Sequence, residues 1–138
     1  MRFVDANVLI LAYHLKPRYT SDQVEMKKRA KNIAIRIDEG EEVATSVIQL
    51  SEAANVLSHA FEPQKLSVLL KAMATKENLK IFDCSREEYL AAIEQSEETG
   101  VGVNDCLAHV LMLANGITEI YSFDKDFDKF SDIKRLEK

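Results

Sequence analysis

The sequence predicts a single α/β domain in which helices cover both faces of a parallel sheet, the three-layer α/β/α class. Three observations support this fold class. The chain has 138 residues, close to the commonest domain size and sufficient to bury an apolar core without disulfides. Short apolar runs typical of buried strands alternate with longer segments of helical periodicity. No internal repeat or low-complexity segment interrupts the alternation, so we expect one domain over residues 1–138.

The composition excludes several other classes of protein. Apolar residues make up 46% of the chain and charged residues 30%, as in ordinary globular proteins. With no signal-like start and no run of about 18 apolar residues, we expect a cytoplasmic protein without a membrane partner. Cys84 and Cys106 form no C-x-x-C pair, so we expect buried apolar residues and no zinc site. The net charge of −5 argues against nucleic-acid binding over the whole surface but leaves room for a local basic patch.

The first third of the chain is expected to form one strand and two helices. The apolar run 3–5 predicts a strand that ends in an acid. Asn7 is then a suitable N-cap for a helix that Pro17 ends. A second helix is expected over residues 20–39, ended by Gly40.

The middle of the chain repeats the strand-to-helix pattern. Residues 43–45 predict the second strand, and Ser46 can cap the helix after it. The apolar face of that helix is expected at positions spaced by three and four residues, Val47, Leu50, Ala54, Leu57 and Phe61. Pro63 should interrupt this pattern before a further helix over residues 64–76.

The last part of the chain contains three more expected strands. The third strand is predicted at 80–83, and Ser85 opens a helix that the glycines near residue 100 break. A helix over 103–115 precedes a fourth strand at 120–122 and a short last strand at 133–136. Alternating strands and helices favour a doubly wound parallel sheet.

Four acids fall where such a sheet binds ligands. Asp5 ends the first strand, and Asp124 lies two residues beyond the fourth. Asp105 lies at the start of its helix, and Glu52 lies one to two turns into the helix after the second strand. Because ligands bind beyond the carboxyl ends of parallel strands, we expect the four carboxylates to converge there.

A cluster of carboxylates is chemically suited to hard divalent metals. Mg²⁺ and Mn²⁺ prefer oxygen ligands, and without metal the clustered carboxylates would repel one another. Such ions offset negative charge and lower the pKa of a coordinated water. The four acids therefore indicate metal-dependent phosphodiester hydrolysis that needs no Cys, Ser or His nucleophile.

Each of these residues also has a purely structural interpretation. Asp5 could be a turn acid, Glu52 a solvated helix residue and Asp105 a helix cap. His109 lies four residues after Asp105 on the same helix face. It could approach a metal or transfer a proton, but packing is the commoner role of a lone helical histidine.

Polar neighbours of the acids are expected to support them. Asn7, besides its capping role, could hold the carboxylate of Asp5, and Ser122 could bond a phosphate or a neighbouring acid. Asp126 and Asp128 lie so close to Asp124 that either could share its role. We count Asn7, Ser122 and Asp126, together with His109, as supporting candidates.

Four motifs in this order resemble the PIN-domain family, and in particular its VapC-type toxins. They are Phe3-Val4-Asp5-Ala6-Asn7, Gln49-Leu50-Ser51-Glu52, Val103-Asn104-Asp105-Cys106-Leu107-Ala108 and Tyr121-Ser122-Phe123-Asp124-Lys125-Asp126-Phe127. The resemblance spans nearly the whole chain. It implies a Mg²⁺- or Mn²⁺-dependent endoribonuclease with a five-stranded parallel sheet in the order 3-2-1-4-5. It also implies an RNA substrate, a homodimer and, for a toxin, an antitoxin partner.

Carried over by motif, four residues correspond to the acids of the family site, namely Asp5, Glu52, Asp105 and Asp124. Asn7 and Ser122 occupy the supporting polar positions. Ser122 replaces the more frequent Thr and keeps its hydroxyl. His109 stands where the family usually has a small residue, which narrows the site or adds a polar group.

Charge is unevenly distributed along the chain. Residues 16–31 contain six basic residues against two acidic ones, whereas residues 83–98 contain six acidic residues against one basic. Lys27, Lys28 and Arg29 are therefore candidates for steering RNA phosphates towards the acids. The simpler alternative is a pair of solvated helix faces.

Two other functions compete with catalysis. The chain could be a PIN-like scaffold that binds RNA or protein without cutting. A phosphate-signalling receiver domain also places acids at strand ends, and Asp83 could be its phosphate acceptor. That interpretation fits less well, since no paired acids follow the first strand and no lysine is suitably placed.

Overall fold

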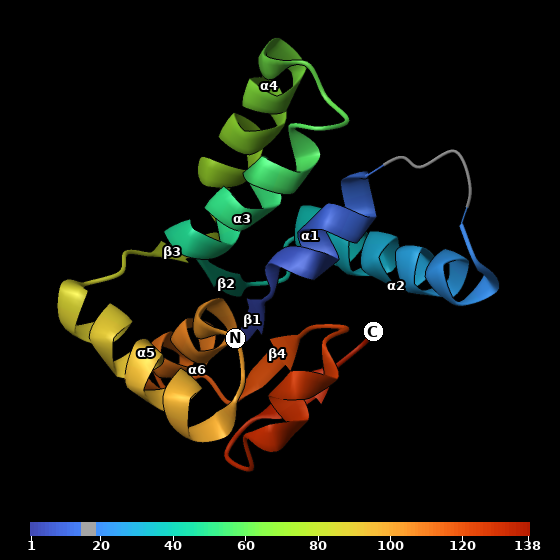
Figure 1. Cartoon of the computed structure of the whole chain (residues 1–138). Helices are drawn as coiled ribbons and strands as arrows, with labels where there is room; N and C mark the ends of the chain where they lie inside the picture. The colour runs from blue at the N-terminus through green and yellow to red at the C-terminus, as the bar shows by residue number, and fades with distance from the viewer. Residues whose placement is uncertain (15–18) are drawn as a thin grey trace.

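The computed structural model describes residues 1–14 and 19–138. Five parallel strands form one sheet in the order β3-β2-β1-β4-β5, which confirms the predicted fold class and strand order (Figure 1). The strands are β1 (Arg2–Val4), β2 (Val43–Ser46), β3 (Leu79–Phe82), β4 (Glu119–Tyr121) and β5 (Lys134–Leu136). The order differs from the 2-1-3-4-5 of flavodoxin-like receiver domains, so the receiver interpretation is wrong.

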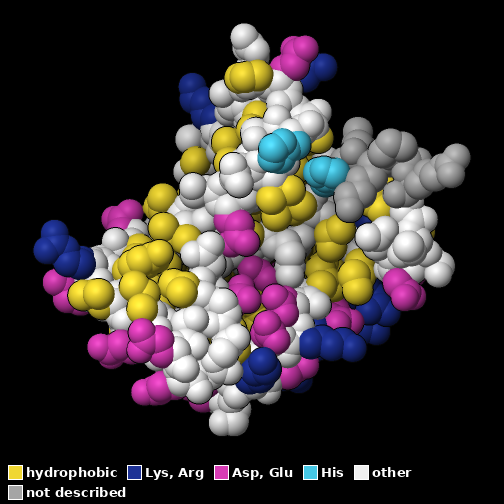
Figure 2. Space-filling model, viewed as in Figure 1, with side chains coloured by type: hydrophobic (Ala, Val, Ile, Leu, Met, Phe, Trp, Pro, Cys, Tyr) yellow, Lys and Arg dark blue, Asp and Glu magenta, His cyan; other side chains and the backbone are white. Residues whose placement is uncertain are grey.

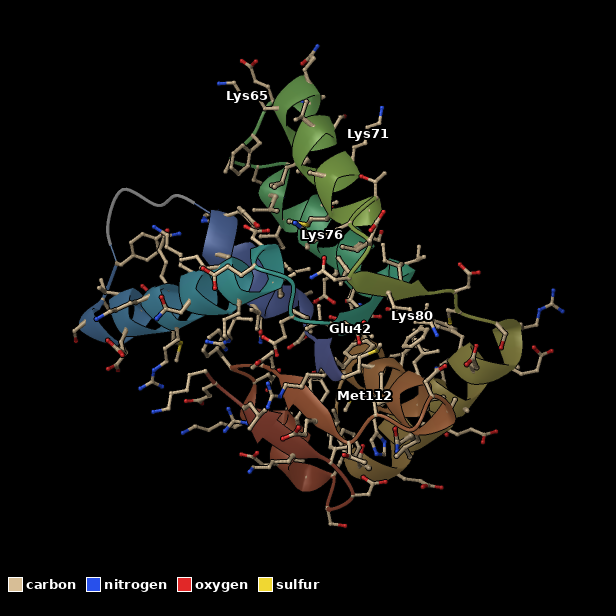
Figure 3. All side chains as sticks on the ribbon, turned by 180° about the vertical axis from the view of Figure 1, so that it is seen from behind. Glu42, Lys65, Lys71, Lys76, Lys80 and Met112 are labelled. Carbon is tan, nitrogen blue, oxygen red and sulfur yellow. The ribbon has the colours of Figure 1, made fainter. Side chains whose placement is uncertain are left out.

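Helices connect and cover these strands. They are α1 (Ala6–Tyr13), α2 (Ser21–Asp38), α3 (Val47–Leu57), α4 (Pro63–Ala74), α5 (Arg86–Thr99), α6 (Val103–Ala114) and the 3₁₀ helix η1 (Lys125–Lys129). None of the helices in the described ranges is long and apolar enough to cross a bilayer. The helices α3 and α4 form a hairpin that projects from the sheet, with Lys65 and Lys71 pointing outward from α4 (Figures 1 and 3).

Successive side chains of the central strands point to opposite faces of the sheet and belong to two separate hydrophobic cores. Phe3 packs against residues of α5 and α6, whereas its neighbour Val4 packs against α1, α2 and α4. In β4, Ile120 and Tyr121 divide in the same way. Because successive strand residues point to opposite faces, β1 and β4 are buried on both sides, as their apolar sequences predicted.

Local capping signals predicted several helix starts correctly. Ser46 accepts a hydrogen bond from the Gln49 backbone N–H and begins α3. Ser85 forms a reciprocal capping box at α5, as does Thr20 at α2, although Thr20 was expected as the first helical residue and not as a cap. Gly100 ends α5 in the left-handed conformation at φ 73°, which a glycine adopts without strain.

Other local predictions are wrong in detail. Asn7 is not a cap: Asp5 is the N-cap residue of α1, and Asn7 lies inside the helix with its side chain bonded to the segment after β4. Pro63 begins α4 rather than preceding it, because its missing N–H costs nothing in a first turn. The strands β3 and β4 each begin one residue earlier than predicted. The predicted helix stop at Pro17 lies outside the described residues, and α1 ends at Tyr13.

The buried face of α3 also differs from the prediction. Its buried residues are Gln49, Ala53 and Leu57, which follow one another at four-residue spacing. Val47, expected on the apolar face, is 46% exposed. The helix is therefore rotated so that one polar side chain lies in the interior, close to the carboxyl end of the sheet.

Candidate metal centre

The four predicted acids come from four segments that end at one edge of the sheet. Asp5 directly follows β1, and Asp124 follows β4 as the N-cap residue of η1. Asp105 is the third residue of α6, and Glu52 lies in the second turn of α3. The charges of Glu52, Asp105 and Asp124 are close enough to Asp5 to be coupled electrostatically. The tertiary structure therefore brings these four residues together.

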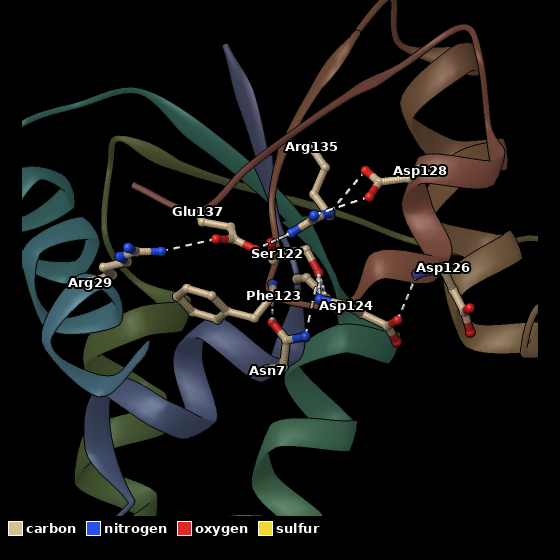
Figure 4. A network of polar contacts seen from close by, with 10 residues as sticks. Asn7, Arg29, Ser122, Phe123, Asp124, Asp126, Asp128, Arg135 and Glu137 are labelled. Atoms are coloured by element: carbon tan, nitrogen blue, oxygen red, sulfur yellow. Dashed lines mark hydrogen bonds and ion pairs between the residues drawn. The ribbon is translucent and has the colours of Figure 1, made fainter. Parts of the chain in front are cut away.

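Ser122 holds the most buried of these acids. The Asp5 side chain is almost fully buried, and the Ser122 hydroxyl donates a hydrogen bond of 2.6 Å to its Oδ2. The same hydroxyl oxygen accepts hydrogen bonds from the Asp124 backbone N–H at 3.0 Å and from Asn7 Nδ2 at 3.4 Å. Asn7 Oδ1 accepts from the Phe123 N–H at 3.4 Å (Figure 4). Both residues predicted as polar supports thus connect the junction of β1 and α1 to the segment after β4.

Three aspartates form the tightest group of carboxylates. Asp105, Asp124 and Asp126 each have a carboxylate oxygen within 4.8 Å of the others. Asp124 Oδ1 also accepts the Asp126 backbone N–H at 2.9 Å, which fixes the loop between them. Asp128 is directed elsewhere, with its two oxygens bound to Arg135 at 3.0 and 3.1 Å. Of the two neighbours considered for sharing the role of Asp124, only Asp126 lies in the cluster.

Burial and mutual repulsion raise the proton affinity of the acids. The pKa of Asp5 is raised to about 7, mainly by burial and further by the charges of Glu52 and Asp124, although the Ser122 hydrogen bond opposes the rise. The pKa of Asp105 is also raised to about 7, by burial and then by the charges of Asp5, Asp124 and Glu52. Ionising these groups together therefore costs free energy unless a cation is present.

No basic side chain in the described ranges forms an ion pair with any of the four predicted acids. Figure 2 shows acidic side chains gathered near the centre of one face, with lysine and arginine side chains to one side. Hard carboxylate oxygens without a protein counter-ion fit a divalent metal such as Mg²⁺ or Mn²⁺. The donor set therefore suits the predicted cofactor.

An open hollow of about 370 Å³ lies beside the acids. It is lined by Glu52, Gly102, Val103, Asn104 and Asp105. Asn104 Nδ2 donates a hydrogen bond of 3.3 Å to Glu52 Oε2 and so joins α6 to α3 at the wall of the hollow. The hollow leaves room for a substrate group next to the carboxylates.

Two positions that the sequence reasoning missed contact this centre. Gln49 is 1% exposed, and its side-chain amide bonds to the backbone of Ala6 and of Asn104. The sequence did contain a signal for its burial, because Gln49 shares a four-residue spacing with the apolar residues Ala53 and Leu57.

Arg135 is the other missed residue, and its side chain is only 11% exposed. Besides Asp128, its guanidinium donates to the Ser122 carbonyl at 3.2 Å and to Glu137 Oε1 at 2.6 Å (Figure 4). Glu137 in turn accepts from Arg29 on α2 at 3.0 Å. This chain of ion pairs fixes the loop after β4 against the rest of the sheet, and no local sequence pattern identifies it.

His109 is engaged away from the acids. Its ring stacks on Phe130 at a centroid distance of 4.0 Å and an interplanar angle of 9°. Its Nε2 lies 2.7 Å from Asp132 Oδ1, and its Nδ1 lies 2.8 Å from Gln95 Nε2. With both ring nitrogens occupied in a buried position, these contacts favour the packing interpretation over a role at the metal.

The candidate RNA-binding residues on α2 differ in whether their side chains already bind other groups of the protein. Lys27 Nζ donates to the carbonyls of Leu11 and His14 at the end of α1. Arg29 is paired with Glu137 and Glu25. Lys28 is exposed, as is Lys31 one turn further. Lys16 and Arg18, which contributed to the predicted basic segment, lie outside the described residues.

Comparison with known proteins identifies a family for the chain. Its sequence matches the family model described as the PIN domain over residues 2–133. A comparison with curated proteins found no match.

Solved structures with the same fold cover nearly the whole chain. VapC20 from Mycobacterium tuberculosis, a toxin that cleaves the sarcin-ricin loop, has a TM-score of 0.72 at 19% identity, over 97% of this chain and 99% of that one. VapBC2 from Rickettsia felis, bound to a promoter DNA fragment, has a TM-score of 0.66 at 16% identity, over 98% and 96%. A toxin-antitoxin complex from Klebsiella pneumoniae has a TM-score of 0.65 at 14% identity, over 96% and 95%. At these identities the likeness shows the fold.

Proposed function

Because the chain belongs to the PIN-domain family, we propose that it is a metal-dependent endoribonuclease that hydrolyses RNA phosphodiester bonds. In this proposal Asp5, Glu52, Asp105 and Asp124 bind Mg²⁺ or Mn²⁺, and Asp126 supports them. The observation that carries the proposal is the convergence of carboxylates from four segments with no basic side chain paired to the four predicted ligands in the described ranges. Carboxylates that are brought together without a basic partner destabilise the protein unless they bind a cation.

The surrounding residues orient the proposed ligands. The Ser122 hydroxyl directs Asp5 Oδ2, and its bond to the Asp124 N–H sets the start of the loop that carries Asp124 and Asp126. When bound, a divalent metal offsets the negative charge of a phosphodiester and lowers the pKa of a coordinated water. The hollow beside Glu52 and Asp105 is the expected place for the nucleotide next to the cut.

We also propose that the chain is the toxin of a VapBC-type pair and acts in the cytoplasm as a homodimer. Support comes from the fold, since similar structures include VapC20 and toxin-antitoxin complexes from two other organisms. An antitoxin segment would then cover the approach to the acids. Size-exclusion chromatography with light scattering tests the dimer, and a small protein encoded next to this chain is the first antitoxin to test for binding.

The direct test of the nuclease is cleavage of total RNA by the purified protein with Mn²⁺, followed by mapping of the cut ends. Asp105→Asn should lose cleavage, because it removes a charge from the tightest group of carboxylates. Asp83→Asn is the matched control, since Asp83 is exposed and directly follows β3 at the same edge without joining the cluster. It should cut like the wild type. Binding of RNA without any cut product would instead indicate a PIN-like scaffold.

A further inference from the structure

Gln49 is a neutral side chain that joins three of the acid-bearing segments. Its Oε1 accepts a hydrogen bond of 2.6 Å from the Ala6 backbone N–H, directly after Asp5. Its Nε2 donates a hydrogen bond of 3.4 Å to the Asn104 carbonyl, directly before Asp105. Three residues further along α3 is Glu52. The Gln49 amide, on the helix that carries Glu52, thus bonds to the peptide groups next to Asp5 and next to Asp105.

The start of α1 needs this acceptor. First-turn N–H groups of a helix lack a helical partner, and Asp5, the N-cap residue, makes no side-chain capping bond. Its carboxylate is instead bonded to Ser122. Gln49 accepts from the Ala6 N–H at 2.6 Å, a group that also lies near the Asp5 carboxylate and favours its ionised form.

The start of α6 is tied to α3 at two atoms of Asn104. The carbonyl accepts from Gln49, and the side-chain amide donates to Glu52 at 3.3 Å. These two bonds fix the first turn of α6, where Asp105 lies, relative to Glu52. The position of α6 at this edge therefore depends on α3.

The residue type fits both bonds and the local charge. A glutamate could accept from the Ala6 N–H but would place an oxygen against the Asn104 carbonyl and add a further carboxylate to the centre. A methionine has similar length but forms neither bond. The glutamine amide supplies an acceptor on one side and a donor on the other without charge.

We propose that Gln49 is a positioning residue that sets the separation of Asp5 and Asp105 and thereby the geometry in which the acids bind a divalent metal. The inference rests on the proposed nuclease function but concerns a residue outside the acids. Groups that orient metal ligands typically change metal affinity or activity by about 10- to 100-fold when removed.

The test compares Gln49→Met with Gln64→Met, because Gln64 is exposed on α4 far from the acids. Mn²⁺ affinity is measured by calorimetry, and kcat and KM on single-stranded RNA are measured at saturating Mn²⁺. Gln49→Met should weaken Mn²⁺ binding by roughly 10-fold and lower kcat by roughly 10- to 100-fold with KM nearly unchanged. Gln64→Met should match the wild type in all three.

Gln49→Glu keeps the acceptor for the Ala6 N–H, but it replaces the donor to Asn104 by an oxygen and adds a negative charge. A lowered kcat together with weaker Mn²⁺ binding in this folded variant supports the proposal even where Gln49→Met does not fold, because an added negative charge by itself would strengthen metal binding. Wild-type kcat and Mn²⁺ affinity in a folded variant, with only a lower melting temperature, overturn it, as does failure of both variants to fold. A wild-type protein that neither binds Mn²⁺ nor cuts RNA contradicts the proposed function instead.

Discussion

Charged side chains cluster at both ends of the central strands, but they are balanced only at one end. At the amino-terminal edge, Glu41 accepts hydrogen bonds from Arg2 at 2.9 Å, from Tyr121 at 2.7 Å and from Arg36 at 3.3 Å. Both arginines also lie 5.4 Å from the Tyr121 ring centroid. These partners lower the pKa of Glu41.

At the carboxyl-terminal edge Asp126 pairs with Lys129 at 3.4 Å, but the four predicted acids have no basic partner in the described ranges. The pKa values of two of them, Asp5 and Asp105, are raised to about 7. Both clusters include residues in or just after β1 and β4, namely Arg2 and Tyr121 in one and Asp5 and Asp124 in the other. The difference shows that the unpaired edge is not a requirement of the fold, because the other edge joins its segments with ordinary ion pairs. An edge that retains unpaired carboxylates is instead suited to a cation from outside the protein.

The largest expected effect is on RNA cleavage, which a substitution at the carboxyl-terminal edge should reduce and one at the amino-terminal edge should not. Asp5→Asn should lower RNA cleavage by at least ~100-fold, because it removes a charge from the proposed metal site. Glu41→Gln should leave cleavage unchanged and lower the free energy of unfolding by about 1 kcal/mol, since it weakens bonds that are partly exposed. Cleavage rates and urea unfolding of both variants measure this. Wild-type cleavage by folded Asp5→Asn would remove Asp5 from the proposed site.

The second effect concerns metal and stability. Saturating Mn²⁺ should raise the melting temperature of the wild type, with ~2.7 kcal/mol available at a hundredfold excess over the dissociation constant. Glu41→Gln should respond equally, whereas Asp5→Asn should respond much less. Differential scanning fluorimetry across millimolar Mn²⁺ and Mg²⁺ provides the measurement. A melting curve that neither ion shifts would contradict a preformed metal site.

The third effect is a difference in pH dependence between the edges. Asp5 has a pKa of about 7 in the folded protein against an ordinary value of 3.8, so the folded state binds this proton more tightly. Its contribution to stability is present below pH 3.8 and is lost as the pH rises towards 7. Metal-free protein should therefore lose about 2 kcal/mol through this carboxyl between pH 5 and 7, at ~1.4 kcal/mol per pH unit.

Glu41 has the opposite sign. Its pKa is lowered from 4.5, so its contribution is present above that pH and is lost as the pH falls. Urea unfolding in EDTA at several pH values should show a flatter profile for Asp5→Asn than for the wild type above pH 5. Glu41→Gln should alter only the acidic limb. Parallel profiles for the wild type and Asp5→Asn would show that Asp5 is not the titrating group.

The smallest effect concerns the exposed basic side chains of α2. Because Lys27 and Arg29 already bind groups of the protein, the exposed pair Lys28 and Lys31 is the better test of RNA steering. Lys28→Gln with Lys31→Gln should flatten the salt dependence of single-stranded RNA binding by about 0.7 in slope for each phosphate group that is no longer bound. Mn²⁺ affinity should not change.

The matched control for this pair is Lys65→Gln with Lys71→Gln on the projecting helix α4 (Figure 3). It removes the same charge at a distance from the acids. Equal slopes for the wild type and for both double variants would mean that RNA approaches over another face.

Local interactions allowed much of the fold to be predicted from the sequence. The caps at Thr20, Ser46 and Ser85 involve residues three positions apart, so their signals are complete within a few letters of sequence. Alternating strands and helices indicated the layers, and acids at strand ends indicated the edge that binds ligands. These features depend on short-range geometry, which tertiary packing left unchanged.

The tertiary structure decided which side chains come together at that edge. Ser122 reaches Asp5 across 117 positions, and Gln49 reaches Ala6 across 43. Asp126 joins the carboxylates while Asp128 turns to Arg135, although both lie within four residues of Asp124. The sequence by itself determined the elements and the kinds of residue at their ends. Which of these side chains contact one another followed from the strand order and from the rotation of α3. Both depend on burying apolar faces that are distant in the sequence, so no local sequence pattern indicates them.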